Sequence, residues 1–305
     1  MGTAEFGVPT LRSLYERYDI VTVVTSPDSQ KGRGRKLEPS PVKTVARELG
    51  LDVLEPADLK DPEFIKKLEE YKADLFFVVA FRVLPREVFT IPPRGTVNLH
   101  ASLLPDYRGA APINWAVING DEYTGLTTFY IGEKIDTGAM IQAKTVSIGP
   151  DETAGELAWR MKEIGAALAL KTVEMIEKGI APGVKQPLSG KRPATKLYKK
   201  DGFIDWSKDA RTIHNQVRGM NPAPGTYIQS SKGPLKIHRT KVVEEYVSGT
   251  PGIIMMSSPK EGIVVSCGRG SLNILEVQPP GKKVMDGASF VRGYRIEKGK
   301  NISEL

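Results

Sequence analysis

The chain has 305 residues, of which 40% are hydrophobic and 26% are charged. That composition is ordinary for a soluble globular protein, and the length allows two domains with buried cores. No apolar run approaches the roughly 20 residues that a membrane span needs. The N-terminus shows no basic segment followed by an apolar one. We therefore expect neither a membrane protein nor a secreted one.

The cysteine content and the net charge bear on the cellular compartment and on the kind of binding partner. A single cysteine, Cys267, cannot form an internal disulfide, which fits the reducing cytosol. We interpret it as a small buried residue after an apolar run. The formal net charge of +7 favours a polyanionic partner such as RNA, although the excess of lysine and arginine can equally form a solvated surface.

The first part of the chain predicts alternating strands and helices. A helix should begin near Val8, and residues 19–25 and 51–54 have the composition of short strands. Ser40 is a suitable N-cap because proline follows it in the first turn of a helix. Residues 74–80 form the most apolar strand, which should be central in the sheet.

Residues 26–37 form a polar loop with four cations. Glycines 32 and 34 do not form a dinucleotide-binding fingerprint, since Gly-x-Gly-x-x-Gly is incomplete, and no Walker-type Gly-Lys-Ser/Thr occurs. A loop with arginine and lysine is suited to phosphate groups, and a solvated mobile loop is the alternative. The candidate contacts are Lys31, Arg33, Arg35 and Lys36.

The stretch from Arg94 to Met140 holds the candidate catalytic residues. Residues 95–99 predict a buried strand that runs into Asn98 and His100. Ligands of open α/β sheets bind at the carboxyl ends of strands, so this amide and this imidazole share one side of a strand where a substrate would bind. Asp136 lies in a second turn. An amide, an imidazole and a carboxylate suit acyl transfer through a charged tetrahedral intermediate.

Each of these residues, taken singly, has a structural alternative. A lone histidine such as His100 at a strand end is more often structural than catalytic. Asn98 can satisfy backbone groups in a turn, and Asp136 before Thr-Gly can form an Asx turn. Their combination in one compact segment weakens these alternatives.

The second half of the chain predicts one long helix and then a β-rich end. Residues 153–178 repeat apolar positions every three or four residues, and Gly179 ends that pattern. Ser207 is expected to cap a later helix that ends near Gly219. From Thr226 onward, short β-rich runs separated by glycine or proline indicate a small OB-like β-barrel.

The composition of residues 182–201 indicates a basic linker between two domains. We predict an α/β domain with a Rossmann-like, doubly wound and mostly parallel sheet over residues 1–181, and a β-barrel over residues 202–305. A barrel tied to a basic linker is a reasonable nucleic-acid-binding module. No cysteine or histidine cluster has metal-ligand spacing, so we expect no metal site. The linker cations selected as candidate contacts are Lys191, Arg192 and Lys196.

The order of several motifs resembles one enzyme family. Asn-x-His at residues 98–100 is followed by Ser-Leu-Leu-Pro at 102–105, Tyr-Arg-Gly-Ala-Ala-Pro at 107–112 and Asp-x-Gly at 136–138. This pattern is similar to that of the formyltransferases that use 10-formyltetrahydrofolate, above all those that act on methionyl-tRNA. The resemblance covers nearly the whole chain, from Gly2 to about Glu297.

The resemblance implies a reaction and a role for each motif. The formyl group of 10-formyltetrahydrofolate would pass to the α-amine of methionyl-initiator tRNA. Asn98 and His100 would stabilise a tetrahedral oxyanion, and Asp136 would orient His100 in its charged form. Many similar proteins have Tyr-Gly where this chain has Phe81-Arg82, so that part of the folate site differs here. The implied folate-binding residues are Arg82, Val83, Leu84, Ser102, Leu103, Leu104 and Pro105.

The resemblance also bears on the cationic loop and on the start of the chain. In the similar enzymes that act on tRNA, the loop that corresponds to residues 26–37 enters the acceptor end, which favours tRNA binding here. Similar proteins carry a short apolar strand before Gly2-Thr3, and a doubly wound sheet without it has a gap. We therefore expect the true start to lie upstream of Met1. We further expect a cytoplasmic monomer.

Four other functions stay open at this point. A formyltransferase that acts on an amino sugar nucleotide, or a formyl-folate hydrolase, would use the same three residues, but the cationic loop argues against both. A non-catalytic RNA-binding protein would not need the set formed by Asn98, His100 and Asp136. A reductase is disfavoured because the glycine fingerprint is absent.

Overall fold

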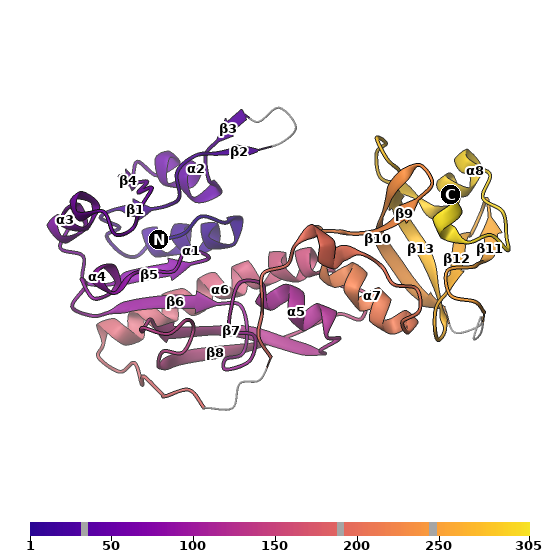
Figure 1. The fold of residues 1–305 in the computed structure, drawn as a ribbon. Coiled ribbons are helices and arrows are strands. Elements are labelled where there is room, and N and C mark those ends of the chain that lie inside the picture. Colours follow the sequence, from indigo (N-terminus) through magenta and orange to yellow (C-terminus); the bar gives the residue numbers. More distant parts are fainter. Residues whose placement is uncertain (32–35, 188–191, 244–248) are drawn as a thin grey trace. The chain divides into compact units, whose positions relative to one another are not determined.

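The computed structural model describes residues 1–31, 36–187, 192–243 and 249–305 (Figure 1). They form two compact units. Unit 1 comprises Met1–Pro112, Thr124–Ser147 and Ala158–Ala194. Unit 2 comprises Ile113–Tyr123, Ile148–Leu157 and Thr195–Leu305.

Within the described residues, unit 1 contains a short two-stranded hairpin and two further β-sheets. The larger has the strand order β5-β6-β7-β8, in which β5 and β6 are parallel and β6 and β7 are antiparallel. The smaller pairs β1 with β4 in parallel. The bounds are β1 (Val23–Val24), β4 (Val53–Leu54), β5 (Phe76–Val79), β6 (Thr96–His100), β7 (Tyr123–Tyr130) and β8 (Met140–Ser147).

Residues Met1 to Thr3 lie between these two sheets. The amide of Gly2 donates to Val24 O of β1 at 2.9 Å, and the amide of Val79 in β5 donates to Met1 O at 3.0 Å. The pairing of Gly2 with Val79 is parallel. The segment therefore joins both sheets into one mostly parallel arrangement, which confirms the predicted Rossmann-like α/β fold.

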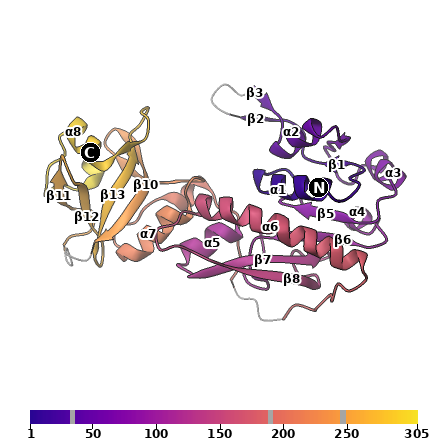
Figure 2. The same cartoon turned by 180° about the vertical axis from the view of Figure 1, so that it is seen from behind.

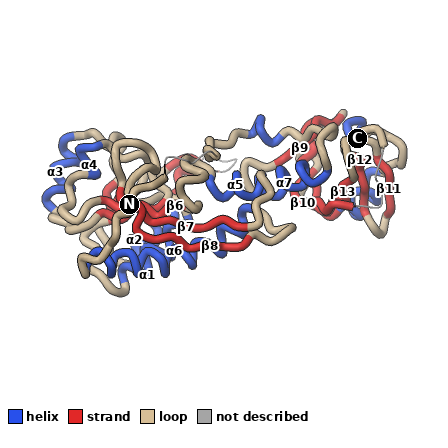
Figure 3. Tube along the Cα trace, turned by 90° about the horizontal axis from the view of Figure 1, so that it is seen from below, coloured by secondary structure: helices blue, strands red, loops and turns tan. Residues whose placement is uncertain are grey.

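Helices cover both faces of this arrangement. Leu68 of α3 (Pro62–Glu70) and Val88 of α4 (Arg86–Phe89) share a core with Phe76 and Val78. Successive strand residues point to opposite faces, so Phe77 packs instead in a cluster with the long helix α6 (Ala154–Glu177). The helices α1 (Val8–Tyr15) and α2 (Pro41–Glu48) form a further cluster over β1. Figures 2 and 3 show α6 running along β6, β7 and β8.

The cationic loop includes residues of two short strands that form a hairpin. Strands β2 (Ser29–Lys31) and β3 (Lys36–Glu38) pair antiparallel, with Lys31 opposite Lys36. Ser40 then caps α2, since its hydroxyl accepts from the amide of Lys43 at 3.0 Å. The hairpin therefore leads directly into α2.

Unit 2 is built on an antiparallel sheet of order β11-β12-β13-β10-β9, with β14 paired to β13. This confirms the predicted β-domain. The strands are β9 (Thr226–Ser230), β10 (Gly233–Val243), β11 (Ile254–Ser258), β12 (Gly262–Ser266), β13 (Ser271–Gln278) and β14 (Met285–Asp286). The helices are α5 (Pro112–Ile118), α7 (Ala210–Gly219) and α8 (Gly287–Tyr294). Short 3-10 turns are η1 (Glu5–Gly7) in unit 1, and η2 (Lys199–Gly202) and η3 (Ile302–Glu304) in unit 2.

One large hydrophobic core holds unit 2 together. Ile213 and Val217 of α7 pack in it with apolar residues of the sheet. Cys267 lies in the same core, 1% exposed, and burial raises the pKa of its thiol to about 12. The expected cap of α7 was wrong: Asp209, not Ser207, accepts from the amide of Arg211 at 2.8 Å. Ser207 instead donates twice to the carboxylate of Asp205, because an aspartate two residues earlier offers a closer turn partner.

A buried histidine joins several segments of unit 2. His214 of α7 is 2% exposed, and its Nδ1 lies 3.0 Å from Thr240 Oγ1. Its Nε2 lies 3.3 Å from Pro150 O and 3.3 Å from Asp151 Oδ1. Burial lowers the pKa of His214, since removal from water disfavours the imidazolium. The neutral ring satisfies both nitrogens here.

None of the helices within the described ranges is long and apolar enough to cross a lipid bilayer.

The lowered pKa of His214 predicts acid sensitivity. The unfolded chain binds a proton to this residue below about pH 6.5, whereas the native state resists it to lower pH. Stability should therefore be lost as the pH falls below about 6.5. The melting temperature of wild type should drop more between pH 7.5 and 5.5 than that of His214→Gln. Equal slopes in the two proteins would contradict the assignment.

Candidate active site

The carboxyl end of β6 presents the first two candidate residues. Asn98 and His100 are two positions apart on one strand and so lie on the same face. Asn98 is partly exposed, and the side chain of His100 is 7% exposed. The strand end thus brings a hydrogen-bond donor and a titratable ring to the edge where α/β folds bind ligands.

The two ring nitrogens of His100 face different partners. Its Nε2 lies 2.8 Å from the carbonyl oxygen of Tyr107, and because a carbonyl can only accept, Nε2 carries a hydrogen. Its Nδ1 lies 3.8 Å from Asp136 Oδ2, which is longer than a hydrogen bond. In the neutral ring the hydrogen is therefore on Nε2, and Nδ1 faces a carboxylate.

Asp136 is fixed by the loop that follows the Ser-Leu-Leu-Pro turn. The backbone amide of Gly109 donates to Asp136 Oδ2 at 2.9 Å, and the side chain of Asp136 is 15% exposed. The structure therefore brings Asp136 beside His100 although they are far apart in the sequence.

Left-handed backbone occurs in three loops around these residues. Ala80 at the end of β5, Tyr107 and Asp136 have φ values of 47°, 58° and 53°. Such conformations cost of order 1–3 kcal/mol outside glycine and collect at functional sites. The surrounding contacts must therefore hold these loops in place.

In the turn predicted to bind folate, several polar groups are hydrogen-bonded within the protein. The hydroxyl of Ser102, a fully buried residue, donates to Asp106 O at 2.7 Å. Thr127 of β7 donates to Ser102 O and accepts from the amide of Leu104. Leu104 is buried, whereas Leu103 and Pro105 are partly exposed.

The loop after β5 contains the other predicted folate residues. Arg82 donates through Nη1 and Nη2 to the carbonyl oxygens of Ala57 and Pro56, at 3.0 and 2.7 Å. Val83 is 70% exposed, whereas Leu84 is buried. Val83 is thus the side chain of this loop that is free to pack on a ligand.

The predicted tRNA-binding cations do not all lie in one described segment. Arg33, Arg35, Lys191 and the side chain of Lys31 lie outside the described residues, and Lys36 is exposed. In unit 1, the guanidinium of Arg192 lies 4.6 Å from the centre of the Tyr107 ring and 3.5 Å from Asp106 Oδ2. In unit 2, Lys196 Nζ lies 5.6 Å from the centre of the Tyr198 ring.

The buried side chain of Lys43 holds the start of the hairpin formed by β2 and β3. Lys43 Nζ lies 2.6 Å from Asp28 Oδ1 and 2.8 Å from Glu55 Oε1. Hydrogen bonds to Asp28 and then Glu55 raise the pKa of Lys43. Asp28 directly precedes β2, so this cluster holds one end of the hairpin against α2.

Two polar residues of this region, Arg108 and Gln186, were not among the predicted site residues. The guanidinium of Arg108 donates to the side-chain oxygen of Gln186. Gln186 also donates to the backbone around Asp136. A glutamine in a stretch of proline, glycine and lysine carries no periodicity or motif that could have revealed it.

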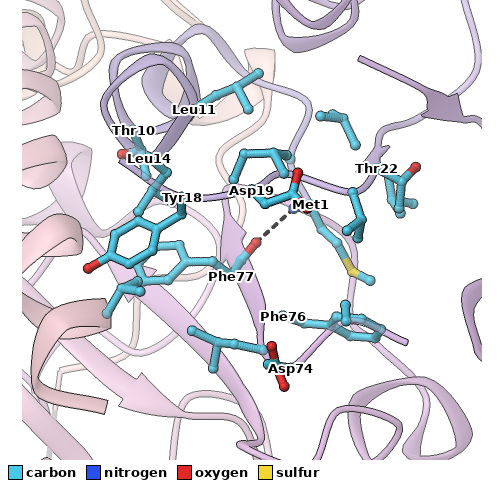
Figure 4. A pocket seen from close by; sticks show the side chains of 18 of the residues that line it. Met1, Thr10, Leu11, Leu14, Tyr18, Asp19, Thr22, Asp74, Phe76 and Phe77 are labelled. Carbon is cyan, nitrogen blue, oxygen red and sulfur yellow. Dashed lines mark hydrogen bonds between the residues drawn. The ribbon is translucent and has the colours of Figure 1, made fainter. Parts of the chain in front are cut away.

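A separate cavity of about 520 Å³ lies between β1 and β5 (Figure 4). Its lining is mostly apolar and includes Leu14 of α1 and Ile176 of α6. The amino group of Met1 donates to Phe77 O at 2.7 Å, and burial lowers the pKa of this amine to about 5. None of Asn98, His100 and Asp136 lines the cavity, so it is distinct from the candidate site.

Within the described ranges, no three histidine, cysteine, aspartate or glutamate residues are grouped so that they could hold a metal ion.

Comparison with known proteins gives consistent matches. The model of the family described as "Formyl transferase" matches residues 7–173, and that of "Formyl transferase, C-terminal domain" matches residues 196–295. A protein of Symbiobacterium thermophilum named methionyl-tRNA formyltransferase is 45% identical over 306 residues, which cover 99% of this chain and 94% of that protein.

Two solved structures share the fold. WlaRD, a sugar 3N-formyl transferase crystallised with dTDP and 5-N-formyl-THF, has a TM-score of 0.69 at 19% identity, covering 92% of this chain and 97% of that one. A variant of HypX from Aquifex aeolicus has a TM-score of 0.60 at 20% identity over 84% of this chain. This chain spans only 45% of HypX.

The loop of Asp136 requires glycine at position 138. A Cβ there would lie 1.6 Å from Tyr130 O, so Gly138→Ala should lower the free energy of unfolding by about 2 kcal/mol or more. Gly132→Ala is the matched control, because nothing lies within 4 Å of its Cβ position. Urea denaturation of both variants measures the effect, and a Gly138→Ala protein as stable as Gly132→Ala would disprove this packing.

Proposed function

The chain belongs to the formyl transferase family, and we propose that it transfers the formyl group of 10-formyltetrahydrofolate to the α-amine of methionyl-initiator tRNA. One observation carries the assignment of the site: His100 Nδ1 lies 3.8 Å from Asp136 at the end of β6. The choice of substrate is supported by 45% identity, over nearly the full length, to a methionyl-tRNA formyltransferase.

The reaction forms one C–N bond and breaks another. The amine nitrogen attacks the formyl carbon, and the carbonyl oxygen becomes negative in a tetrahedral intermediate. Collapse of the intermediate breaks the bond to N10 of the folate, which takes up the proton that the amine releases. Asn98 and protonated His100 donate hydrogen bonds to the negative oxygen, and such donors stabilise the transition state because they are preorganised.

In this scheme, Nδ1 of His100 interacts both with the oxyanion and with Asp136. Its Nε2 is occupied by Tyr107 O, so only Nδ1 is available to donate to the oxyanion. The same nitrogen faces Asp136, whose charge stabilises the imidazolium. Asp136 also accepts the amine proton, directly or through water, and returns it to N10 of the folate as the intermediate collapses.

The folate site follows from the loops around these residues. Val83 is exposed and packs on the pterin, and the backbone from Arg82 to Leu84 supplies hydrogen bonds. Leu103, Leu104 and Pro105 form the opposite wall. The internal hydrogen bond of Ser102 suggests that this residue shapes the turn.

The tRNA acceptor end meets cations from two segments. Residues 31–36 contribute Lys31, Arg33, Arg35 and Lys36, and residues 191–196 contribute Lys191, Arg192 and Lys196. Lys43 holds Asp28, which lies just before these residues, and the binding of phosphates by these cations should depend on salt.

Alanine at Asn98 or His100 should lower turnover by about 100-fold each, the usual effect of losing one oxyanion donor. The KM for 10-formyltetrahydrofolate should change little. Gln142→Ala, which removes a β8 amide bonded to Thr172, serves as the control. Initial rates with charged initiator tRNA, an amino sugar nucleotide and water alone identify the acceptor. Near-normal rates in both site variants would end the proposed mechanism.

Charge reversal tests the tRNA contact. Arg33→Glu combined with Lys36→Glu should raise the KM for tRNA and reduce the slope of log binding constant against log salt by about 2, since two phosphate contacts are lost. Lys66→Glu with Lys67→Glu is the matched control, because it makes the same charge change at exposed positions of α3. Identical salt slopes in both double variants would favour a merely solvated loop.

A further inference from the structure

Gln186 is a buried polar residue in an otherwise exposed segment. It is 5% exposed and is the one buried residue between positions 181 and 187. Just before it, Val184 pairs antiparallel with Met140 through two hydrogen bonds of 2.7 Å. The segment that resembles a linker in composition is therefore attached to unit 1 at this point.

The side-chain amide of Gln186 uses its full hydrogen-bonding capacity. Nε2 donates to Asp136 O at 2.9 Å and to Gly138 O at 2.8 Å. Oε1 accepts from Arg108 Nε at 3.1 Å and Nη2 at 2.6 Å. A neutral amide offers two donors and two acceptor sites, so each has a partner.

These partners belong to the two loops that position the candidate site. The loop with Arg108 also supplies Tyr107 O, which accepts from His100, and the Gly109 amide, which donates to the Asp136 carboxylate. The other loop carries Asp136 itself. Gln186 thus links the two loops in addition to the bond from Gly109, and it binds the backbone carbonyl of Asp136, a residue with a left-handed φ.

We propose that Gln186 is a positioning residue that sets the distance between the carboxylate of Asp136 and Nδ1 of His100. The inference rests on the proposed function for its catalytic consequence, but the geometric claim can be measured without it. Misplacement of a catalytic group by about 1 Å can lower a rate by about 100-fold.

Two substitutions of Gln186 distinguish the effect of its side-chain donors from that of its acceptor. Gln186→Glu retains acceptors for Arg108 but removes both donors to the carbonyl oxygens of Asp136 and Gly138. Gln186→Leu removes both sides at similar volume. Gln216→Leu is the matched control, because Gln216 Nε2 also donates to two carbonyl oxygens, those of Asp201 and Phe203, at 3.0 Å each, but in unit 2.

The first measurement is steady-state formyl transfer to charged initiator tRNA. Both Gln186 variants should lose about 10- to 100-fold in kcat, with KM values for tRNA and folate within about twofold of wild type. Gln216→Leu should keep the wild-type kcat. A purely structural role of Gln186 would lower the melting temperature without this loss of kcat.

The second measurement is the nitrogen spectrum of the histidine rings, which is simple because the chain has three histidines. The Nδ1 signal of His100 should move in Gln186→Glu and Gln186→Leu, and those of His214 and His238 should not. Unchanged His100 signals, or a wild-type kcat in the folded variants, would overturn the proposal. If wild type formylates no tRNA, the proposed function fails, and the His100 signal alone still decides the role of Gln186.

Discussion

One hydrogen bond to a backbone carbonyl orients the imidazole of the candidate site. Tyr107 O lies 2.8 Å from Nε2 of His100, so Nδ1 is the nitrogen that faces Asp136. A backbone carbonyl thereby decides which ring nitrogen carries the hydrogen of the neutral imidazole. Tyr107 itself has a left-handed φ, so the tautomer of a strand-end histidine is linked to the conformation of a loop.

Much of the fold follows from local sequence pattern. The apolar runs at 19–25 and 74–80 and the long periodic stretch at 153–178 predict β1, β5 and α6, because burial on a sheet imposes these periodicities. The cap of α7 was harder to predict. Ser207 and Asp209 are both good N-caps, and only the turn that Ser207 makes with Asp205 selects between them.

The site could be predicted only in part. Asn98 and His100 follow from their place at the end of a predicted strand. The closeness of Asp136 does not follow from spacing, since it depends on a hydrogen bond from Gly109. Gln186 and Tyr107 O could not be found at all. A backbone carbonyl has no sequence signature, and a buried glutamine becomes recognisable only when the chain returns to the sheet.

Because Cys267 is buried, the reactivity of its thiol reports how often the core of unit 2 opens. Thiol reagents attack the thiolate, and with a pKa of about 12 this sulfur is almost wholly protonated at neutral pH and is sealed in the core of unit 2. Alkylation must therefore wait for the core to open. As the chain has one cysteine, its labelling rate would report the breathing of that core without any engineered probe.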